Sequence, residues 1–323
     1  MPRIAVTSPL PGGALDRLAD SHDVTIRPPG PPSGGAELAE FAGGAEALIC
    51  LLADRVDEQV FDRCGSLRVV ANYAVGFNNI DCAAATRAGV WVTNTPDVLT
   101  DATADCAWTL LLAVSRRVLE GDRLVRSGGF TGWRPDLLLG AGLQGKTLGV
   151  VGFGRIGQAV ARRGAVFGME VVYHSPRPID SPLGVYQPDL DALLQQAHVV
   201  SLHCRLTPDT RRLLDRRRLG LMRPDAIVIN TSRGEVLDEA ALAAALAAGR
   251  LAGAGLDVYE EEPTVHRALL GLENVVLLPH VGSATREARA AMTELAVDNV
   301  LAVLAGRRPP TPVNDPATGK ERK

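Results

Sequence analysis

One short segment constrains the fold of this chain more than any other: residues 146–157 read KTLGVVGFGRIG. An apolar run leads directly into glycines spaced G-x-G-x-x-G, and a segment of helical length follows. This order is typical of the first β–α unit of a dinucleotide-binding domain, where Gly152 permits a tight turn, Gly154 lets the backbone approach a pyrophosphate, and Gly157 lets helix and strand pack closely. The structural alternative is a glycine-rich turn used for packing alone. The flanking strand and helix favour dinucleotide binding.

Strand-like and helix-like segments alternate along the whole chain. Short β-branched runs predict strands at residues 3–7, 22–26, 47–52, 67–71, 90–93, 147–151, 170–173, 198–202, 226–230, 253–258 and 274–278. Apolar spacing predicts helices at residues 13–20, 57–64, 101–126, 156–167, 190–197, 239–248 and 286–305, with a closing loop at 307–314 and a charged tail at 319–323. Such alternation predicts parallel strands joined by right-handed crossovers, in two successive α/β series.

The composition excludes several classes of protein. An apolar content of 46% against 22% charged residues is ordinary for a globular protein, and 323 residues suffice for two domains. A net charge of −3 gives no general attraction to nucleic acid or to an anionic membrane. The longest uncharged stretch has 13 residues, fewer than the ~20 that a membrane helix needs. We therefore expect neither a nucleic-acid partner nor a membrane partner.

The start of the chain and its cysteines predict a cytoplasmic location. The N-terminal residues MPRIAVTSPLPGG contain no apolar core of a secretory signal. The five cysteines are odd in number and include no C-x-x-C pair, which favours free thiols in a reducing compartment.

The strand that follows the glycine motif ends without a carboxylate. NAD-binding domains usually place an Asp or Glu about 20 residues after the motif, where it binds the adenosine ribose. Here the strand is followed by Ser175, Pro176 and Arg177. A hydroxyl and a guanidinium can bind a 2′-phosphate by charge-assisted hydrogen bonds. The sequence predicts NADP(H) in preference to NAD(H); NAD(H) stays possible, with Arg177 then a solvated loop charge.

Three further segments resemble the D-isomer-specific 2-hydroxyacid dehydrogenase family. They are INTSRG at 229–234, GLDVYEEEP at 255–263 and PHVGSAT at 279–285. With NYAVGFNNID at 72–81, TDATAD at 100–105 and the segment from residue 133 through the glycine motif, the resemblance spans nearly the whole chain. The chain is most similar to the glyoxylate/hydroxypyruvate reductase branch. Pro176 departs from the NADP-using relatives, which commonly have a basic residue there.

The resemblance implies a catalytic trio of Arg233, Glu262 and His280. Reduction of a 2-oxo acid needs a proton for the carbonyl oxygen, and an imidazole titrates near neutrality. A carboxylate beside the ring, here Glu262, stabilises its protonated form and orients it. Arg233 supplies a planar cation that can bind a substrate carboxylate and polarise the carbonyl.

Taken singly, each member of the trio has a structural alternative. A lone histidine after a proline is more often a loop residue, and a lone arginine is equally a salt-bridge partner. Periodicity does not choose among Glu260, Glu261 and Glu262; the family places its glutamate directly before the proline, which points to Glu262.

The resemblance also implies binding residues outside the trio. Val75 and Gly76 resemble the backbone amides that hold the substrate carboxylate, with a plain β–α turn as the alternative. Trp133 matches a tryptophan that reaches the partner subunit's pocket, with an anchor in a dimer interface as the alternative. Thr210 and Asp257 resemble groups near the pyrophosphate and the nicotinamide amide, and a buried strand-end acid is the alternative for Asp257. Further implied cofactor contacts are Thr103, Phe153, Arg155, Ile156, His203, Cys204, Thr231, Ser232 and Gly282.

His203 and Cys204 are adjacent, but no second ligand pair lies at a suitable spacing, so we expect no metal site.

The family architecture implies two Rossmann-like or flavodoxin-like, doubly wound parallel-sheet domains with the active site in a cleft between them. Residues 1–100 plus 286–323 would bind substrate and residues 101–285 the dinucleotide, with closure about two hinges and a homodimer formed through residues 101–145. The implied function is NAD(P)H-dependent reduction of a small 2-oxo acid, glyoxylate or hydroxypyruvate, to the D-2-hydroxy acid.

Alternatives remain open. They are a sister activity on 3-phosphoglycerate, D-lactate, formate or phosphite, and a non-enzymatic dinucleotide sensor like the corepressors built on this scaffold. The corepressors carry extended disordered tails, and this chain adds only the short segment 307–323 after its last predicted helix.

Overall fold

The computed structural model describes residues 1–316, so the tail expected at 319–323 lies outside the described residues. The contacts divide the chain into two compact units. The first comprises Met1–Leu99 together with the chain from Ala284 onward, and the second comprises Thr100–Ser283. Within residues 1–316, no helix is both long enough and apolar enough to cross a lipid bilayer.

The first unit contains a parallel sheet whose strand order is β2-β1-β3-β4-β5. This order matches that of flavodoxin-like sheets, with the reversal between β1 and β3. Side chains alternate across the sheet: Ile4 and Val6 pack on the face covered by α11, and Ala5 packs on the opposite face with α2 and α3. The strands are β1 (Arg3–Val6), β2 (Asp23–Ile26), β3 (Ala47–Leu51), β4 (Val69–Tyr73) and β5 (Trp91–Thr93). The helices are α1 (Asp16–Ala19), α2 (Gly35–Phe41), α3 (Glu58–Arg63), α4 (Cys82–Arg87) and α11 (Arg286–Leu304).

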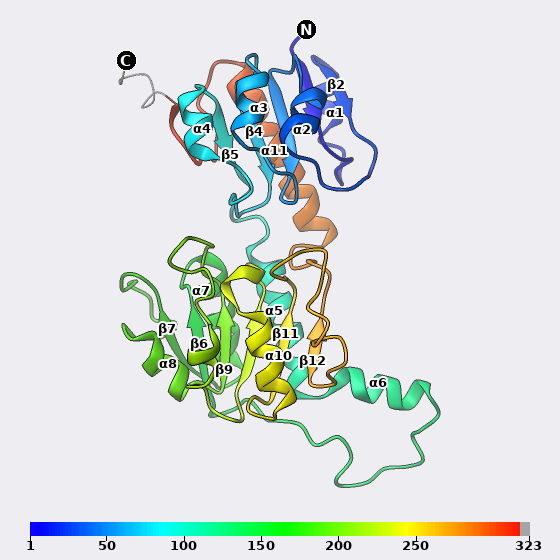
Figure 1. Ribbon diagram of the computed structural model, residues 1–323, viewed down its shortest axis with the longest axis vertical. Coiled ribbons are helices and arrows are strands. Elements are labelled where there is room, and N and C mark those ends of the chain that lie inside the picture. Colours follow the sequence, from blue (N-terminus) through cyan, green and yellow to red (C-terminus); the bar gives the residue numbers. More distant parts are fainter. Residues whose placement is uncertain (317–323) are drawn as a thin grey trace. The chain divides into compact units, whose positions relative to one another are not determined.

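The second unit contains a longer parallel sheet, ordered β12-β11-β10-β9-β6-β7-β8 (Figure 1). Read from β8, this is the Rossmann order extended by one strand, with the reversal between β6 and β9. The strands are β6 (Thr147–Val151), β7 (Glu170–His174), β8 (Val185–Tyr186), β9 (Val199–Leu202), β10 (Ile227–Asn230), β11 (Gly253–Leu256) and β12 (Val275–Leu277). The helices are α5 (Thr100–Ser115), α6 (Val118–Arg126), α7 (Arg155–Val166), α8 (Leu190–Gln196), α9 (Arg216–Leu219) and α10 (Glu239–Ala247), with a 3₁₀ turn η1 (Gly234–Val236).

Helices cover both faces of the second sheet. Trp108 of α5 and Val160 of α7 pack on one face, and the Trp108 indole donates to the Val160 carbonyl at 3.1 Å. Leu193 of α8 and Leu242 of α10 pack on the other face. The predicted fold class, two doubly wound parallel α/β domains, is confirmed.

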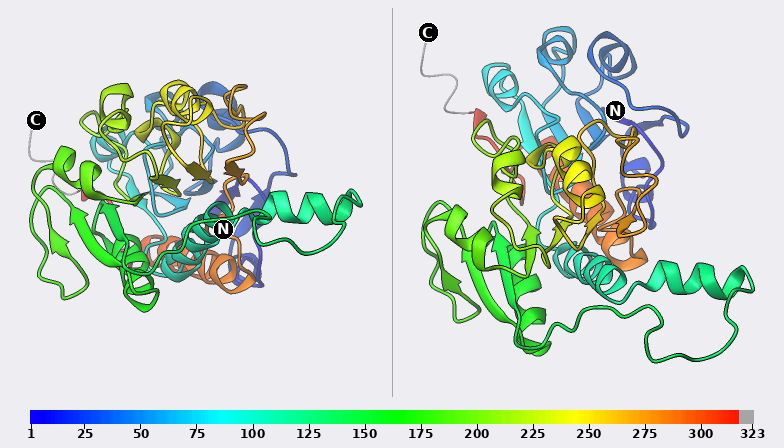
Figure 2. Two further views of the ribbon diagram at one scale, coloured as in Figure 1. Left: turned by 90° about the horizontal axis from the view of Figure 1, so that it is seen from below. Right: turned by 60° about the horizontal axis from the view of Figure 1, so that its bottom comes forward.

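The helix predicted at residues 101–126 is wrong as a single element, because it breaks into α5 and α6. Arg117 adopts a left-handed conformation with φ 53°. The Ser115 carbonyl accepts the N–H of Ala141 at 2.8 Å. In a continuous helix this carbonyl would instead accept the N–H of the residue four positions further along the chain. Helix α6 and the segment after it therefore extend away from the rest of the second unit, as both figures show (Figures 1 and 2).

The other predicted boundaries differ from the observed ones by a few residues, which is usual for element ends. The elements missed were short ones: α2, α4, α9, β8 and η1. Each spans two to seven residues, too few for a hydrophobic period to stand out.

Candidate active site

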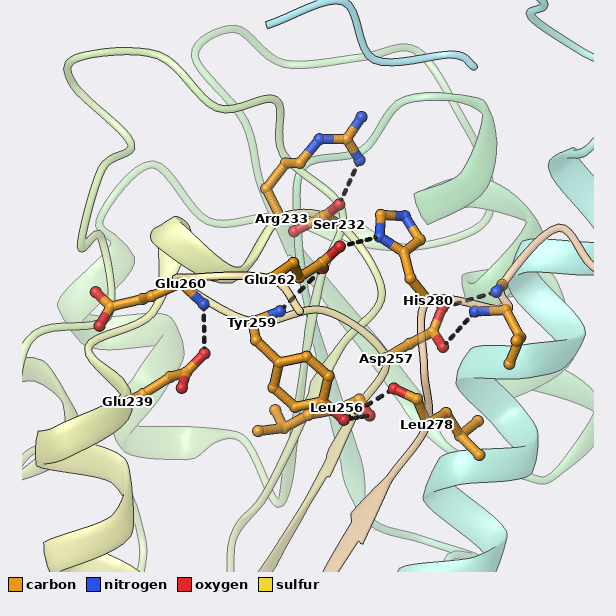
Figure 3. A network of polar contacts seen from close by, with 12 residues as sticks. Ser232, Arg233, Glu239, Leu256, Asp257, Tyr259, Glu260, Glu262, Leu278 and His280 are labelled. Carbon is orange, nitrogen blue, oxygen red and sulfur yellow. Dashed lines mark hydrogen bonds and ion pairs between the residues drawn. The ribbon is translucent and has the colours of Figure 1, made fainter. Parts of the chain in front are cut away.

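The three residues of the expected trio follow three neighbouring strands. Arg233 comes after β10, Glu262 lies in the loop after β11, and His280 comes after β12. Because the strands are parallel, these loops emerge at one edge of the sheet, where doubly wound proteins bind ligands. Figure 3 shows the three side chains grouped at this edge.

Glu262 and His280 are in direct contact. The imidazole Nδ1 lies 2.8 Å from one carboxylate oxygen of Glu262, and the other oxygen accepts the N–H of Tyr259 at 3.1 Å (Figure 3). Burial alone would raise the pKa of Glu262, but the hydrogen bond and charge of His280, the Tyr259 N–H and the charge of Arg233 together lower it. The carboxylate is therefore ionised at neutral pH and accepts from both partners.

The backbone of His280 is fixed by a second acid. His280 has a φ of 54°, a region that few residues with a side chain adopt. The next two N–H groups, of Val281 and Gly282, each donate to the buried carboxylate of Asp257 at 2.7 Å. Burial raises the pKa of Asp257, and these two hydrogen bonds oppose that shift. Asp257 thereby holds the strained turn that presents the imidazole.

Arg233 lies in a loop held by a buried amide. The side chain of Asn230, at the end of β10, donates to the Arg233 carbonyl at 2.9 Å and accepts from the Ser232 N–H at 3.0 Å. The guanidinium donates to the Ser232 carbonyl at 2.7 Å. Burial lowers the pKa of Arg233 and the charge of Glu262 raises it, and an arginine remains a cation. The site therefore joins a fixed cation to a carboxylate–imidazole pair.

The three glycines of the motif differ in what surrounds them. Gly152 has a φ of 93°, and a Cβ there would lie 2.4 Å from the Cys204 backbone nitrogen. A Cβ on Gly157 would lie 2.1 Å from the Gly152 carbonyl oxygen. A Cβ on Gly154, the N-cap residue directly before α7, which provides no side-chain cap, would meet nothing within 4 Å. Packing explains the first two glycines, whereas the open space at Gly154 fits a pyrophosphate approaching the helix N-terminus.

The turn also lies where a dinucleotide is expected to bind. Because Gly152 contacts the backbone of His203 and Cys204, the turn is at the strand-order reversal between β6 and β9. Burial lowers the pKa of His203 to about 3, and its ring contacts the Ser201 hydroxyl at 2.7 Å. Burial raises the pKa of the Cys204 thiol to about 11. Within residues 1–316 no group of His, Cys, Asp or Glu side chains could hold a metal ion.

Other expected cofactor residues gather around Asp257. A Cβ at Gly282 would lie 3.0 Å from the Asp257 carboxylate and 3.5 Å from the Thr103 methyl group. The Thr231 hydroxyl is buried and has no hydrogen-bond partner among the described residues, as expected of a group that meets a ligand. The residues therefore fit a nicotinamide dinucleotide.

The remaining expected cofactor positions are spread over the same edge of the sheet. The Ser175 hydroxyl donates to the Arg177 carbonyl at 2.6 Å, and Pro176 and Arg177 are exposed. The Thr210 hydroxyl donates to the Arg205 carbonyl at 2.6 Å. Phe153 is buried and stacks on Tyr173 with ring centroids 3.8 Å apart, so only its backbone can face a ligand. Arg155 and Ile156 form the first turn of α7.

The expected substrate residues lie elsewhere. Val75 and Gly76 follow β4 in the first unit, where the amides of Asn94 and Asn72 donate to their carbonyls at 2.8 and 2.7 Å. Among residues 1–316, the N–H groups of Val75 and Gly76 donate to no protein atom. Trp133 lies on the segment after α6 and is 82% exposed.

Two residues that contact the loop of Glu262 were not expected from the sequence. Tyr259 donates from its hydroxyl to the Leu278 carbonyl at 2.8 Å, which ties the Glu262 loop to the strand end before His280. Glu239 accepts the Glu260 N–H at 2.5 Å. Tyr259 belongs to the segment GLDVYEEEP, which also contains Glu262. Its position in that segment could therefore have identified it as a residue of the site. Glu239 follows a helix cap and looks like an ordinary acid of a first turn.

Comparison with known proteins gives one consistent family. The family model described as D-isomer specific 2-hydroxyacid dehydrogenase, NAD binding domain, matches residues 108–282. The chain is 46% identical over 322 residues to a glyoxylate reductase of Thermococcus litoralis, which covers 97% of each chain. It is 47% identical over 320 residues to a glyoxylate reductase of Thermococcus kodakarensis, which covers 97% of this chain and 96% of the relative.

Solved structures agree over the full fold. A protein from Thermus thermophilus superposes with a TM-score of 0.92 at 50% identity, covering 97% of this chain and 100% of the other. The NADPH-dependent glyoxylate/hydroxypyruvate reductase of Sinorhizobium meliloti, solved with NADP and malonate, superposes with a TM-score of 0.88 at 35% identity, covering 98% and 97%.

The surroundings of the glycines predict that one alanine substitution weakens cofactor binding and that another lowers the stability of the fold. Gly154 has an ordinary extended backbone, and a Cβ at this position would enter open space. The melting temperature of Gly154→Ala should therefore match that of the wild type. Its methyl group would meet the pyrophosphate, and a steric cost of about 1–3 kcal/mol should weaken dinucleotide binding about 5- to 150-fold. Gly157→Ala places a methyl group against backbone and should lower the melting temperature. Thermal melts and fluorescence titration with NADPH check both; wild-type affinity in Gly154→Ala would contradict the assignment.

Proposed function

This chain belongs to the D-isomer specific 2-hydroxyacid dehydrogenases, an NAD(P)-dependent oxidoreductase family, and we propose that it reduces glyoxylate or hydroxypyruvate to the corresponding 2-hydroxy acid. The contact between Glu262 and His280, beside Arg233, is the observation that carries the proposal. The named activities of the similar glyoxylate reductases support the choice of substrate.

His280 is the proton donor in this proposal. Its Nδ1 faces Glu262 at 2.8 Å, so Nε2 is the ring nitrogen that faces the substrate. A reduced nicotinamide supplies a hydride to the carbonyl carbon when it is bound. His280 then gives the proton on Nε2 to the carbonyl oxygen, while Glu262 stabilises the protonated ring and fixes its orientation.

Arg233 binds and polarises the substrate. A guanidinium forms paired hydrogen bonds with a carboxylate, and its charge stabilises the negative charge that develops on the carbonyl oxygen. Val75 and Gly76 are proposed to hold the substrate carboxylate through their N–H groups. The hydrogen bonds from Asn72 and Asn94 support this role, because they engage the two carbonyls and thereby orient the loop.

The cofactor preference is the finer part of the proposal. We propose NADP(H) over NAD(H), with Ser175 and Arg177 at the 2′-phosphate; the Ser175 hydroxyl then exchanges its hydrogen bond to the Arg177 carbonyl for one to the phosphate. The absence of a carboxylate at residues 175–177 and the exposed Arg177 guanidinium support this preference. The named NADPH dependence of the Sinorhizobium meliloti reductase is consistent with it.

The first test is an absorbance assay of cofactor oxidation with glyoxylate, hydroxypyruvate and pyruvate. We expect glyoxylate and hydroxypyruvate to be reduced with a lower Michaelis constant for NADPH than for NADH. Pyruvate differs from glyoxylate and hydroxypyruvate by small groups. The kcat/KM for the preferred substrates should therefore exceed that for pyruvate by about 10–200-fold. A clear preference for NADH would overturn the cofactor assignment. If no 2-oxo acid caused oxidation of the cofactor, the protein would bind a dinucleotide but lack the proposed activity.

Replacing the proton donor should separate catalysis from cofactor binding. His280→Ala removes the acid, and general acid catalysis contributes about 10²–10⁴-fold, so kcat should fall by that factor. NADPH affinity should stay at the wild-type value, because the glycine turn and α7 are untouched. Steady-state kinetics and a fluorescence titration measure the two effects. Full turnover of His280→Ala at neutral pH would refute the assignment.

We also propose that the chain forms a homodimer through α6 and the segment that follows it. This region carries large exposed apolar side chains that one copy leaves uncovered, and clusters of this kind usually mark an interface. They are Val118 at 50% exposure, Leu119 at 40%, Val125 at 62%, Phe130 at 51%, Trp133 at 82% and Leu139 at 69%.

The dimer proposal predicts a specific response in light scattering. The wild type should have twice the mass of one chain, and the double variant Phe130→Ser, Leu139→Ser should have the mass of a single chain. Val166→Ser is the matched control, because Val166 is 84% exposed on α7 and lies outside the proposed interface. A wild type with the mass of one chain would contradict the proposal.

A further inference from the structure

Glu239 is a buried acid that forms no direct ion pair within the described part of the chain; the charge of His266 lowers the pKa of its carboxyl group without such a contact. It is the first residue of α10 and only 3% exposed, yet among residues 1–316 it forms no ion pair with Lys, Arg or His. Burial raises the pKa of its carboxyl group. Burying a carboxyl group that forms no ion pair costs free energy. The groups that donate hydrogen bonds to it therefore indicate which part of the structure it holds in place.

The hydrogen bond that the Glu239 carboxylate accepts comes from the loop that carries Glu262. One oxygen of Glu239 accepts the Glu260 N–H at 2.5 Å, and Figure 3 shows this contact beside the Glu262–His280 pair. This hydrogen bond lowers the pKa of Glu239 against the effect of burial. The Glu260 N–H lies two residues before Glu262 in the chain, so the Glu239 carboxylate anchors the loop at that point.

The anchored loop is continuous with the catalytic candidates. Tyr259, next to Glu260, donates its N–H to Glu262 at 3.1 Å. The Tyr259–Glu260 backbone also lies directly against Gly234, where a Cβ would be 1.8 Å from the Tyr259 carbonyl carbon. A shift of the loop at Glu260 would therefore change the positions of Glu262 and of the segment next to Arg233.

We propose that Glu239 is a positioning residue that sets the place of Glu262 against His280 through the backbone of residues 259–262. The proposal rests on the proposed function for its catalytic consequence. A role in capping α10 is already filled by Asp238, whose side chain accepts the Ala241 N–H at 2.8 Å. Glu239 is thus available to the loop, and Asp238 provides a matched control.

The test compares kcat, NADPH affinity and amide hydrogen exchange of the 258–266 peptide in four proteins. In Glu239→Ala the loop loses its anchor, so exchange should accelerate and kcat should fall about 10- to 100-fold, the effect of a shift near 1 Å. NADPH affinity should not change. Asp238→Ala removes the cap of the same helix and should retain wild-type kcat and loop exchange. Glu239→Gln keeps one oxygen for the Glu260 N–H and should lower kcat less than alanine does.

Each result decides the proposal. Wild-type kcat and loop exchange in both Glu239 variants would overturn it, as would an equal loss of kcat in Asp238→Ala, which would reduce the effect to helix stability. If Glu239→Ala does not fold, Glu239→Gln decides: a lower kcat with faster loop exchange supports the proposal, and wild-type values overturn it. A wild type that reduces no 2-oxo acid would refute the proposed function, while the exchange comparison would still test the anchoring by Glu239.

Discussion

The level carboxyl ends of β10, β11 and β12 are the constraint on which the candidate site depends. Parallel pairing aligns Asn230 with Leu256 and Leu256 with Leu277, so the three loops leave the sheet at one height. Parallel strands must be joined by crossovers, and each strand end is therefore free to start a new loop at this edge. Arg233, Glu262 and His280 are far apart in the sequence, and each follows the end of one of these strands. The sheet therefore brings the three side chains together, and contacts between these side chains are not needed to specify the fold.

Two buried acids convert this approximate arrangement into a fixed one. Asp257 and Glu239 both take backbone N–H groups as partners in place of a side-chain cation. A backbone donor has few degrees of freedom, so a carboxylate that binds it fixes the path of the main chain directly. Leaving such a donor or acceptor unpaired when buried costs about 1–3 kcal/mol, which makes the alternative loop conformations unfavourable. The loops of the candidate site are therefore held by two acids outside the proposed catalytic trio.

Much of this could be predicted from the sequence, for identifiable reasons. Apolar strands and amphipathic helices repeat with fixed periods, and the glycine turn has a steric requirement that only glycine meets, so the fold class and the dinucleotide turn were accessible. The break between α5 and α6 was not, because it depends on the Ser115 carbonyl binding Ala141, a contact between segments 26 residues apart. Glu239 was missed because a first-turn acid is normally solvent-exposed, and only the tertiary structure shows that it is buried. The proposed catalytic roles, the substrate contacts and the dimer remain predictions.

The run of three glutamates shows how the structure resolves what the pattern left open. Glu260 pairs with Arg212 at 3.1 Å, Glu261 is exposed, and Glu262 contacts His280. Only Glu262 therefore belongs to the charged group that includes Arg233. When His280 is protonated, these three side chains carry two positive charges and one negative charge. The excess of one positive charge matches a substrate with one carboxylate, so binding of a small 2-oxo acid would leave the group neutral.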